Sequence, residues 1–300
     1  MTEILPRGST LSVGEAIVAA NQWLSRFDLG FGQGSIESAD DAAWIVLEAA
    51  KLSPVLPPDY DVVLTDAAIS QAEEWLWRRA YDRVPVAYLT GRTWFAGLEF
   101  RADERALIPR SPLAELIVHD FFGFLPELNA LRVLDLCTGG GCIALAIASY
   151  YADATVVGTD ISAKALELAR ENRSQLGLEE RVEWLQGDLF EPVRGRTFDL
   201  IISNPPYVDK PDIEAMPAEF RTEPLLGLAS GEDGLDITHR ILNEAAPLLS
   251  DNGVLIVEVG NSAEALTRAK PDIEFGWIEF SNGGDGVFLL PRSALVANGA

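Results

Sequence analysis

Beyond residue 130 the chain alternates short apolar, β-rich runs with amphipathic helical stretches, and this alternation restricts the possible fold more than any other feature. It predicts a doubly wound α/β sheet, mostly parallel, with both faces covered by helices. The last two runs, 275–280 and 287–290, flank the turn-rich stretch 282–286 and predict an antiparallel hairpin at the sheet edge. The other expected strands are 132–136, 155–159, 182–186, 199–203 and 254–258, and the expected helices are 143–151, 163–176, 236–249 and 262–270.

The first 90 residues follow a different pattern. Apolar residues recur at helical spacing over 12–52 and again over 65–81, with several prolines between the two stretches. We therefore expect a small helical domain over residues 1–91. Residues 92–108 predict a β-hairpin linker, and a helix is expected over 113–122 at the start of a larger domain that spans 109–300. The tryptophans of the first domain are expected in its core rather than in a ligand site: Trp23, Trp44, Trp75 and Trp77.

Charge limits the partners of this chain. Its 300 residues are 48% hydrophobic, enough for a sizeable core, which excludes a disordered tail or a disulfide-stapled miniprotein. They carry 23 Lys and Arg against 46 Asp and Glu, a net charge of −23 with histidines neutral. A surface this acidic repels phosphate backbones, so binding to naked DNA is not expected. The charge either serves solubility alone or favours a basic macromolecular partner.

The cysteines and histidines give no metal-site signal. Cys137 and Cys142 are the only cysteines, and His119 and His239 are isolated in sequence, so no metal is expected. Two small thiols in buried positions are typical of a reducing compartment. The N-terminal residues show no signal-peptide pattern, and no apolar run approaches about 18 residues. We therefore expect a cytoplasmic protein with no membrane partner.

A glycine-rich turn is the first candidate ligand site. Residues 133–142 predict a strand that runs into Gly139–Gly141 and then into a helix, and glycines there let the backbone approach a ligand closely. Asp160 ends the next predicted strand, where its carboxylate can accept hydrogen bonds from both hydroxyls of a ribose. The spacing of Gly139, Gly141 and Ala144 also matches a dinucleotide fingerprint, so an NAD-dependent oxidoreductase remains an alternative.

The end of the third predicted strand offers a further contact for a nucleoside. Asp188 follows Gly187 there and can accept a hydrogen bond from an adenine amino group, while Leu189 can pack on the ring. An aspartate after a strand also often caps a helix, and this alternative is equally open.

The tetrapeptide Asn204-Pro205-Pro206-Tyr207 follows the predicted strand 199–203. Ligands of open α/β sheets bind beyond the carboxyl ends of the strands, so these four residues are expected to face the glycine turn. The prolines restrict the backbone on both sides of Asn204. The Asn204 side-chain oxygen and the Pro205 carbonyl can together accept both hydrogens of a planar –NH₂ group, and Tyr207 offers a flat face for stacking.

This geometry suits a difficult nucleophile. The nitrogen of a carboxamide or an aromatic amine reacts poorly because its lone pair is delocalised. Two acceptors aim it at a methyl carbon and stabilise the positive charge that grows on it during transfer. No strong base is needed, because the methylated cationic amide is itself acidic. Asn204, Pro205, Pro206 and Tyr207 are therefore the predicted catalytic residues.

With these motifs the chain resembles the protein-(glutamine side-chain amide) methyltransferases, class I enzymes that carry Asn-Pro-Pro-Tyr and use S-adenosyl-L-methionine. Within that family it is most similar to the branch that modifies large-subunit ribosomal protein L three. Ser111-Pro112 and Cys137 stand where the release-factor branch usually has Pro-Glu and Gly. The matching stretches are 83–90, 107–112, 204–209, 223–231 and 282–288.

The resemblance implies a class I methyltransferase domain, a basic ribosomal protein as substrate and S-adenosyl-L-homocysteine as product. It implies that the first domain helps to grip the substrate protein, and that Asn204–Tyr207 hold the glutamine amide. The cofactor-binding residues that it implies are Asp135, Thr138, Gly139, Gly140 and Gly141 for the methionine and ribose part, Asp160 for the ribose hydroxyls, Asp188 and Leu189 for adenine, and in addition Ile161 and Asn204.

Other functions remain open at this point. A release factor is an alternative substrate for the same chemistry. An adenine-amine methyltransferase of nucleic acid would use the same tetrapeptide, but the largest basic run here is Arg78-Arg79. A non-catalytic partner of ribosome assembly would not require an intact Asn204. An oxidoreductase would need an acid or base for hydride transfer, and none is evident near Asn204.

Overall fold

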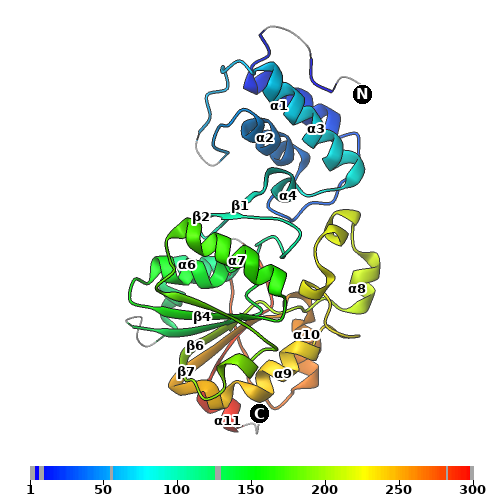
Figure 1. Ribbon diagram of the computed structural model, residues 1–300. Coiled ribbons are helices and arrows are strands. Elements are labelled where there is room, and N and C mark those ends of the chain that lie inside the picture. Colours follow the sequence, from blue (N-terminus) through cyan, green and yellow to red (C-terminus); the bar gives the residue numbers. More distant parts are fainter. Residues whose placement is uncertain (1–3, 7–9, 55–56, 126–129, 282, 298–300) are drawn as a thin grey trace. The chain divides into compact units, whose positions relative to one another are not determined.

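The computed structural model describes residues 4–6, 10–54, 57–125, 130–281 and 283–297 (Figure 1). Asn282 of the glycine-rich stretch lies outside the described residues. The chain forms two compact units, and each is described separately below. The N-terminal unit consists of Met1–Thr93 together with Pro217–Glu223, and the C-terminal unit consists of Trp94–Met216 together with Pro224–Ala300.

The N-terminal unit is helical, as predicted. Its helices are α1 (Val13–Leu24), α2 (Ser38–Ala49), α3 (Asp66–Trp77), which continues into a π-helical turn (Arg78–Asp82), and α4 (Val86–Thr90). Ser12 begins α1 with a capping box, in which its hydroxyl accepts from the Glu15 N–H and the Glu15 carboxylate accepts from the Ser12 N–H. Thr65 caps α3 in the same position.

The expectation that the tryptophans form the core of this unit is wrong for three of the four. Trp44 is buried, whereas Trp23 and Trp75 are only half-buried and the Trp77 side chain is 40% exposed. The buried faces of the helices consist mainly of alanine, leucine and isoleucine. Trp23 and Trp77 instead join Phe27 and Tyr81 in a cluster of rings at the surface.

The predicted hairpin is confirmed as β1 (Arg92–Phe95) and β2 (Leu98–Arg101). The helix that follows, α5 (Leu113–Val118), ends earlier than predicted. Asp120, Phe121 and Phe122 adopt left-handed backbone angles with φ near +52°, so the chain turns into a short 3₁₀ segment (Asp120–Gly123) instead of continuing the α-helix.

The seven-stranded sheet of the C-terminal unit has the order β5-β4-β3-β6-β7-β9-β8. The first five strands are parallel, and β9 pairs antiparallel with both β7 and β8. The predicted doubly wound sheet with an antiparallel terminal hairpin is therefore confirmed, although β8 is only two residues long. The strands are β3 (Arg132–Leu136), β4 (Thr155–Asp160), β5 (Val182–Gln186), β6 (Phe198–Ser203), β7 (Leu249–Glu258), β8 (Gly276–Trp277) and β9 (Val287–Pro291).

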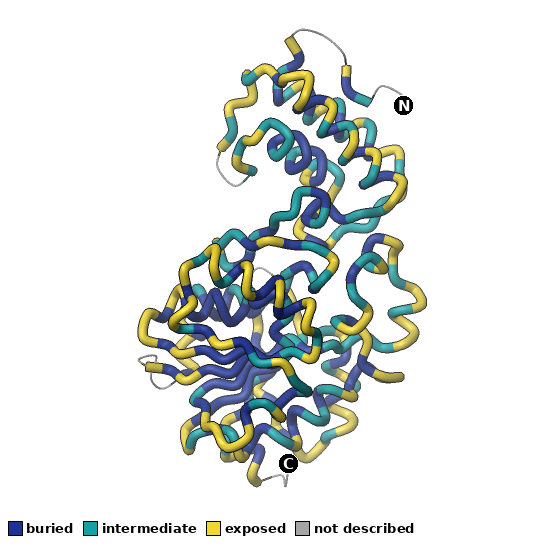
Figure 2. Tube along the Cα trace, viewed as in Figure 1, coloured by how far each residue is buried: buried dark blue, intermediate teal, exposed yellow. Residues whose placement is uncertain are grey.

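Helices cover both faces of this sheet (Figure 1). One face is covered by α5, α6 (Cys142–Tyr150) and α7 (Ala163–Leu176), and the other by α9 (Asp236–Glu244), α10 (Ala263–Ala269) and α11 (Arg292–Ala297). A further short helix, α8 (Lys210–Ala215), follows the end of β6. The central strands β3, β4, β6 and β7 are buried along most of their length, whereas the outer faces of the helices are exposed (Figure 2).

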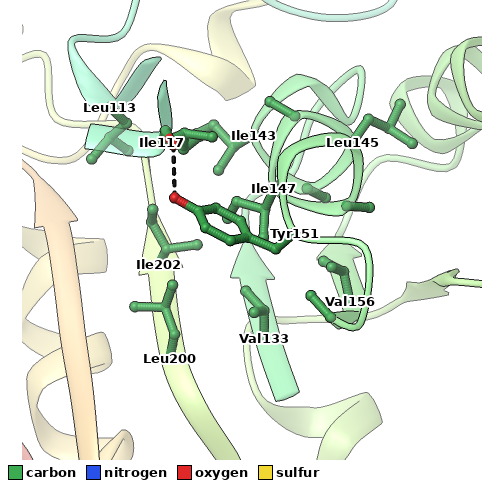
Figure 3. Packing of buried hydrophobic residues seen from close by; sticks show 14 of the residues in the cluster. Leu113, Ile117, Val133, Ile143, Leu145, Ile147, Tyr151, Val156, Leu200 and Ile202 are labelled. Carbon is green, nitrogen blue, oxygen red and sulfur yellow. Dashed lines mark hydrogen bonds between the residues drawn. The ribbon is translucent and has the colours of Figure 1, made fainter. Parts of the chain in front are cut away.

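Alternate residues of each strand supply the two cores. Val133 and Val156 pack beneath α5 and α6, whereas their neighbours Leu134 and Val157 belong to the core on the opposite face. In the first core the hydroxyl of Tyr151 donates a hydrogen bond to the Ile117 carbonyl over 2.7 Å, so this buried polar group is satisfied (Figure 3).

The order of the strands decides where a ligand can bind. From β3 the chain passes to β4 and β5 on one side, and then returns to place β6 and β7 on the other side of β3. The carboxyl ends of β3 and β6 therefore form the switch point of the sheet, where connections leave in opposite directions. Ligands of doubly wound sheets bind at such a point.

Candidate active site

A cavity of about 260 Å³ lies at the switch point, and all the residues that line it belong to the C-terminal unit. It collects side chains and backbone from the carboxyl ends of β3, β4, β5 and β6. The predicted site residues that line it are Thr138, Gly139, Gly140, Asp160, Ile161, Asp188, Leu189, Asn204 and Pro206. The predicted site residues that do not line it are Asp135, Gly141, Pro205 and Tyr207.

Asp135 shapes the glycine turn from within the protein. Its side chain is fully buried, and one carboxylate oxygen accepts hydrogen bonds from the Thr138 hydroxyl and from the Ala144 N–H, the latter at 3.2 Å. Burial raises the pKa of this carboxyl to about 7. Its other oxygen, Oδ1, has no hydrogen-bond partner among the described residues. A buried acceptor of this kind favours a cationic or N–H donor close by.

Gly141 is needed for packing and for backbone conformation. A Cβ atom at this position would lie 2.8 Å from the Trp184 ring of β5 and 3.2 Å from Ala169 of α7. The residue also adopts φ +85°, in the left-handed region that glycine favours. Gly141 therefore allows α6 to begin close to the sheet, while Gly139 and Gly140 form the wall of the cavity.

Asp160 ends β4 and is fixed in the cavity wall. One of its carboxylate oxygens accepts from the Gly139 N–H at 2.9 Å, and the other accepts from the Ser162 N–H at 2.8 Å. Burial raises the pKa of this carboxyl, and the backbone hydrogen bonds oppose that effect. Each oxygen keeps a second lone pair. The carboxylate can therefore accept two hydroxyl groups of a ligand without moving.

The end of β5 carries the next pair of cavity residues. The Asp188 carboxylate forms a 2.9 Å ion pair with Arg240 of α9, and Leu189 turns into the wall with φ +48°. The Asp188 carbonyl, rather than its side chain, accepts the Glu191 N–H in the short 3₁₀ segment that follows. Asp188 lines the cavity, and its side chain does not cap that segment.

Sequence reasoning missed Ile237 and Arg240, which line the cavity from α9. The two residues are three positions apart on one face of the predicted helix 236–249, which was a usable signal. Their contact with Asp188 depends on how α9 packs on the sheet, and local sequence does not show it. Arg105–Ser111 and Pro224–Ala229 also contribute lining residues, although the sequence assigned roles to none of them: Arg105, Ala106, Leu107, Pro109, Arg110, Ser111, Pro224, Leu226, Gly227 and Ala229.

The Asn204–Tyr207 corner begins where β6 ends. Ser203 is paired with Leu136 of β3, and its hydroxyl donates to the Leu136 carbonyl over 2.8 Å. This contact brings the start of the corner level with the start of the glycine turn. Asn204 and Pro206 line the cavity, whereas Pro205 is buried.

Tyr207 lies behind the cavity wall. Its hydroxyl donates to the Glu258 carboxylate over 2.8 Å. Its ring packs on Gly260, where an added Cβ would come within 2.6 Å of the ring. The structure thus brings Asn204 to the same cavity as Asp160 and Thr138, and it holds Tyr207 by contacts outside that cavity.

Other chemistries find little support among the described residues. In the part of the chain that the structure describes, no group of three or more histidine, cysteine or acidic side chains is placed to hold a metal ion. Within the same described ranges, no helix has the length and apolar character needed to cross a membrane. Burial raises the pKa of both cysteine thiols, that of Cys142 to about 12, which disfavours a thiolate nucleophile.

The groups around the cavity suit a nucleoside that carries a positive charge. Asp160 can accept ribose hydroxyls, Leu189 and Ile237 are apolar surfaces for a base, and the backbone of Gly139 and Gly140 is accessible. The acceptor oxygens of Asp135 and Asp160 lie on the glycine-turn side, where a cation is favoured. On the remaining side Asn204 offers an amide oxygen.

Comparisons with known proteins agree with this arrangement. The family model "Methyltransferase small domain" matches residues 121–219. The hMettl16 catalytic domain, solved in complex with a MAT2A 3′UTR hairpin, has a TM-score of 0.51 and 16% identity, over 76% of this chain and 81% of that one. Fold and cavity together define a class I methyltransferase.

Curated relatives narrow this class to one family. The ribosomal protein uL3 glutamine methyltransferase of Francisella tularensis is 44% identical over 272 residues, which cover 89% of this chain and 85% of that protein. The enzyme of the same name from Xanthomonas campestris is also 44% identical, over 92% of this chain and 91% of that protein. The chain belongs to the family of ribosomal protein uL3 glutamine methyltransferases, and the resemblance drawn from its sequence is confirmed.

Proposed function

We infer that this protein transfers a methyl group from S-adenosyl-L-methionine to the side-chain amide nitrogen of a glutamine in ribosomal protein uL3. The observation that carries this inference is that Asn204 and Asp160 line one cavity at the switch point of the sheet. A donor held by Asp160 and an amide held by Asn204 would therefore meet in that cavity. The names of the relatives at 44% identity support the same chemistry.

The residues of the cavity fit S-adenosyl-L-methionine, which when bound supplies an electrophilic methyl group on a sulfonium. Thr138, Gly139 and Gly140 would hold its methionine part, and Asp160 would hold the ribose hydroxyls, with Ile161 beside it in the cavity wall. Asp188 and Leu189 would meet adenine, with Ile237 packing on the ring from α9. Asp135 and Gly141 would act indirectly, since they maintain the shape of the glycine turn.

The Asn204 corner would hold the acceptor. The side-chain oxygen of Asn204 and the carbonyl of Pro205 accept the two N–H groups of the glutamine amide, so its nitrogen is directed at the methyl carbon. The N–CH₃ bond forms as the S–CH₃ bond breaks, and S-adenosyl-L-homocysteine is left. Both acceptors stabilise the positive charge that grows on nitrogen. The proton then passes from the acidic methylated amide to solvent, and no base of the protein is required.

The protein substrate is proposed from charge and family together. Ribosomal proteins are basic, and a chain with a net charge of −23 attracts a basic partner. Residues 1–91, joined by the linker 92–108 to a methyltransferase domain over 109–300, would supply the recognition domain. In the structure the segment Pro217–Glu223 groups with that first part. The reaction would take place in the cytoplasm, before uL3 is covered by ribosomal RNA.

The test is incubation with S-adenosyl-L-methionine that carries a labelled methyl group, followed by location of the label with mass spectrometry. Purified uL3, a purified release factor, and an RNA or DNA substrate are offered separately, and the Asn204→Ala variant is the control. Label on one glutamine of uL3, lost in the variant, is the expected result. Label only on the release factor would assign the protein to that substrate, and label only on nucleic acid would overturn glutamine methylation.

A further inference from the structure

Glu258 is a buried carboxylate directly behind the Asn204 corner. It is the last residue of β7, and in the pairing of β6 with β7 its neighbour Val257 lies opposite Ser203. One residue further along both parallel strands, Glu258 therefore comes level with Asn204. Only 4% of the Glu258 residue surface is exposed. A carboxylate buried to this degree requires hydrogen-bond donors.

Two hydroxyl groups satisfy it. The Tyr207 hydroxyl donates to one carboxylate oxygen over 2.8 Å, and the Ser111 hydroxyl donates to the other in a short hydrogen bond. Burial raises the pKa of Glu258, and these two hydrogen bonds together with the charge of Arg110 oppose that effect. The carboxylate thus joins two segments that are far apart in the chain.

Both of these segments reach the cavity. Ser111, with its neighbours Pro109 and Arg110, lines one side, and Asn204 and Pro206 line another. Ser111 is itself fixed, because its hydroxyl oxygen accepts the Leu113 N–H at the start of α5 over 3.1 Å. Through Glu258 and Ser111, the Asn204 corner is therefore connected by hydrogen bonds to the start of α5.

Tyr207 is held through its hydroxyl, its ring and its backbone. Besides its hydroxyl, its ring rests on Gly260, and its backbone carbonyl accepts the Ser262 hydroxyl over 3.0 Å. Gly260 has φ +45°, and a Cβ there would overlap the ring at 2.6 Å. Tyr207 does not line the cavity. These contacts fix the backbone next to Asn204.

We propose that Glu258 is a positioning residue for methyl transfer, which acts through Tyr207 and Ser111 to fix the acceptor oxygens of the Asn204 corner. This inference rests on the proposed function. It gives Tyr207 a role other than stacking on the substrate amide. A corner that moves by about 1 Å would misdirect the amide nitrogen and lower turnover, while leaving the binding of the cofactor and of the substrate protein nearly unchanged.

The test compares Tyr207→Phe with Tyr151→Phe. Each substitution removes one tyrosine hydroxyl from the C-terminal unit and keeps the ring. The Tyr151 hydroxyl donates to the backbone carbonyl of Ile117 in α5 and interacts with Asp120, and Tyr151 does not line the cavity. The measurements are kcat and KM for uL3, the Kd for S-adenosyl-L-methionine by calorimetry, and Tm for both variants.

For Tyr207→Phe we expect kcat to fall about tenfold or more, with KM and the cofactor Kd within about twofold of their original values. Tyr151→Phe should shift Tm by a similar amount without the loss of kcat. A kcat for Tyr207→Phe within about twofold of the unaltered protein, or a loss equal to that of Tyr151→Phe, would overturn the proposal. If the unaltered protein did not methylate uL3, the proposed function itself would fail instead.

A second set of variants identifies the carboxylate as the connecting group. Ser111→Ala and Tyr207→Phe act through the same residue, so their effects on kcat should be less than multiplicative in the double variant. Fully multiplicative effects would contradict a shared role. Glu258→Gln, which keeps the size of the side chain but places an N–H group against a hydroxyl donor, should lower kcat at least as far as Tyr207→Phe.

Discussion

The guanidinium of Arg79 lies 3.0 Å from the carboxylate of Glu219, although the two residues are 140 positions apart in the sequence. Both side chains are almost completely buried in the N-terminal unit. Arg79 also contacts Asp41 at 2.6 Å, and Arg83 contacts Glu219 at 3.1 Å. The carboxylate of Glu219 reaches these arginines because Pro217–Glu223 is part of that unit. The chain then continues to Pro224, which lines the cavity.

Replacing Arg79 should strongly destabilise the N-terminal unit. Arg79→Ala would leave the carboxylates of Asp41 and Glu219 buried with reduced compensation, and loss of one partner from a buried ion pair costs about 3–5 kcal/mol. Urea denaturation followed by circular dichroism measures the change. Arg268→Ala, which removes an exposed ion pair with Glu264, is the control and should change stability by no more than about 0.5 kcal/mol. Equal losses for the two variants would contradict the interpretation.

The Asn204 side chain should matter for turnover and not for cofactor binding. Asn204→Ala removes one preorganised acceptor for the amide, so kcat should fall by a factor of about one hundred or more. Calorimetry with S-adenosyl-L-methionine should give an affinity close to that of the unaltered protein. Asp160→Ala is the complementary variant, and it should mainly weaken cofactor binding. A large loss of affinity in Asn204→Ala would place this residue on the cofactor side instead.

Alanine substitutions at two glycines distinguish the cost of backbone strain from the cost of steric overlap. Gly141 and Gly177 both have positive φ, +85° and +67°, but an added Cβ would meet the Trp184 ring at 2.8 Å only at Gly141. Alanine at either site incurs about 1 kcal/mol of left-handed strain. Gly141→Ala should lower the free energy of unfolding by about 1–3 kcal/mol more, because the added methyl group overlaps the packed core. Thermal unfolding of the two variants measures the difference, and equal Tm values would disprove it.

The buried carboxyl of Asp135 should make stability depend on pH. Its folded pKa is raised to about 7, whereas an aspartate in the unfolded chain titrates near 3.9 or so. Between these values the folded state binds a proton that the unfolded state has released. The contribution of Asp135 is therefore most favourable below about pH 4 and is lost as the pH rises toward 7, by at most about 1.4 kcal/mol per pH unit.

Chemical denaturation of Asp135→Asn provides the comparison. The asparagine oxygen can still accept from Thr138 and Ala144, but the side chain does not titrate. Relative to this variant, the unaltered protein should lose stability as the pH is raised from about 5 to about 7. A difference that stays constant over this range would show that Asp135 titrates at its ordinary value.

Association with uL3 should depend on salt. The net charge of −23 attracts a basic protein, and added ions screen that attraction. Raising NaCl from about 50 to about 300 mM should weaken binding of uL3 by at least about tenfold, measured by calorimetry or interferometry. The affinity for S-adenosyl-L-methionine is the reference, because its contacts lie inside the cavity and are screened less. Salt-independent binding of uL3 would remove the electrostatic part of the proposal.

Local sequence patterns predicted much of the C-terminal unit. The predicted strands matched β3 and β5 at both ends: β3 is buried over most of its length, whereas β5, at the sheet edge, places Val182 and Trp184 inward and Glu183 outward. Asp160 and Asn204 were located because each follows an apolar run, and parallel strands bring their carboxyl ends to one edge. The positive φ at Asp120 was not predictable in this way, since no glycine or proline interrupts the helical pattern before Gly123.

The remaining features depend on long-range packing. Arg240 contacts Asp188 because α9 packs beside β5's end, and Glu219 contacts Arg79 because a loop that follows β6 belongs to the N-terminal unit. Tyr207 was expected to present its ring to the substrate, and the structure has it against Gly260 and Glu258. Neither hydrophobic periodicity nor motif spacing records which distant residue satisfies a buried charge.

Because Pro217–Glu223 belongs to the N-terminal unit, it also determines whether the two units can be separated by cleavage or truncation. No single proteolytic cleavage of the backbone separates the two units, because the N-terminal unit consists of two separate segments of the chain. A fragment that stops at residue 93 would lack Glu219 and would leave Arg79 with Asp41 as its one remaining acidic neighbour among the contacts described here. A fragment that is meant to fold as the N-terminal unit should therefore carry Pro217–Glu223 joined to Met1–Thr93.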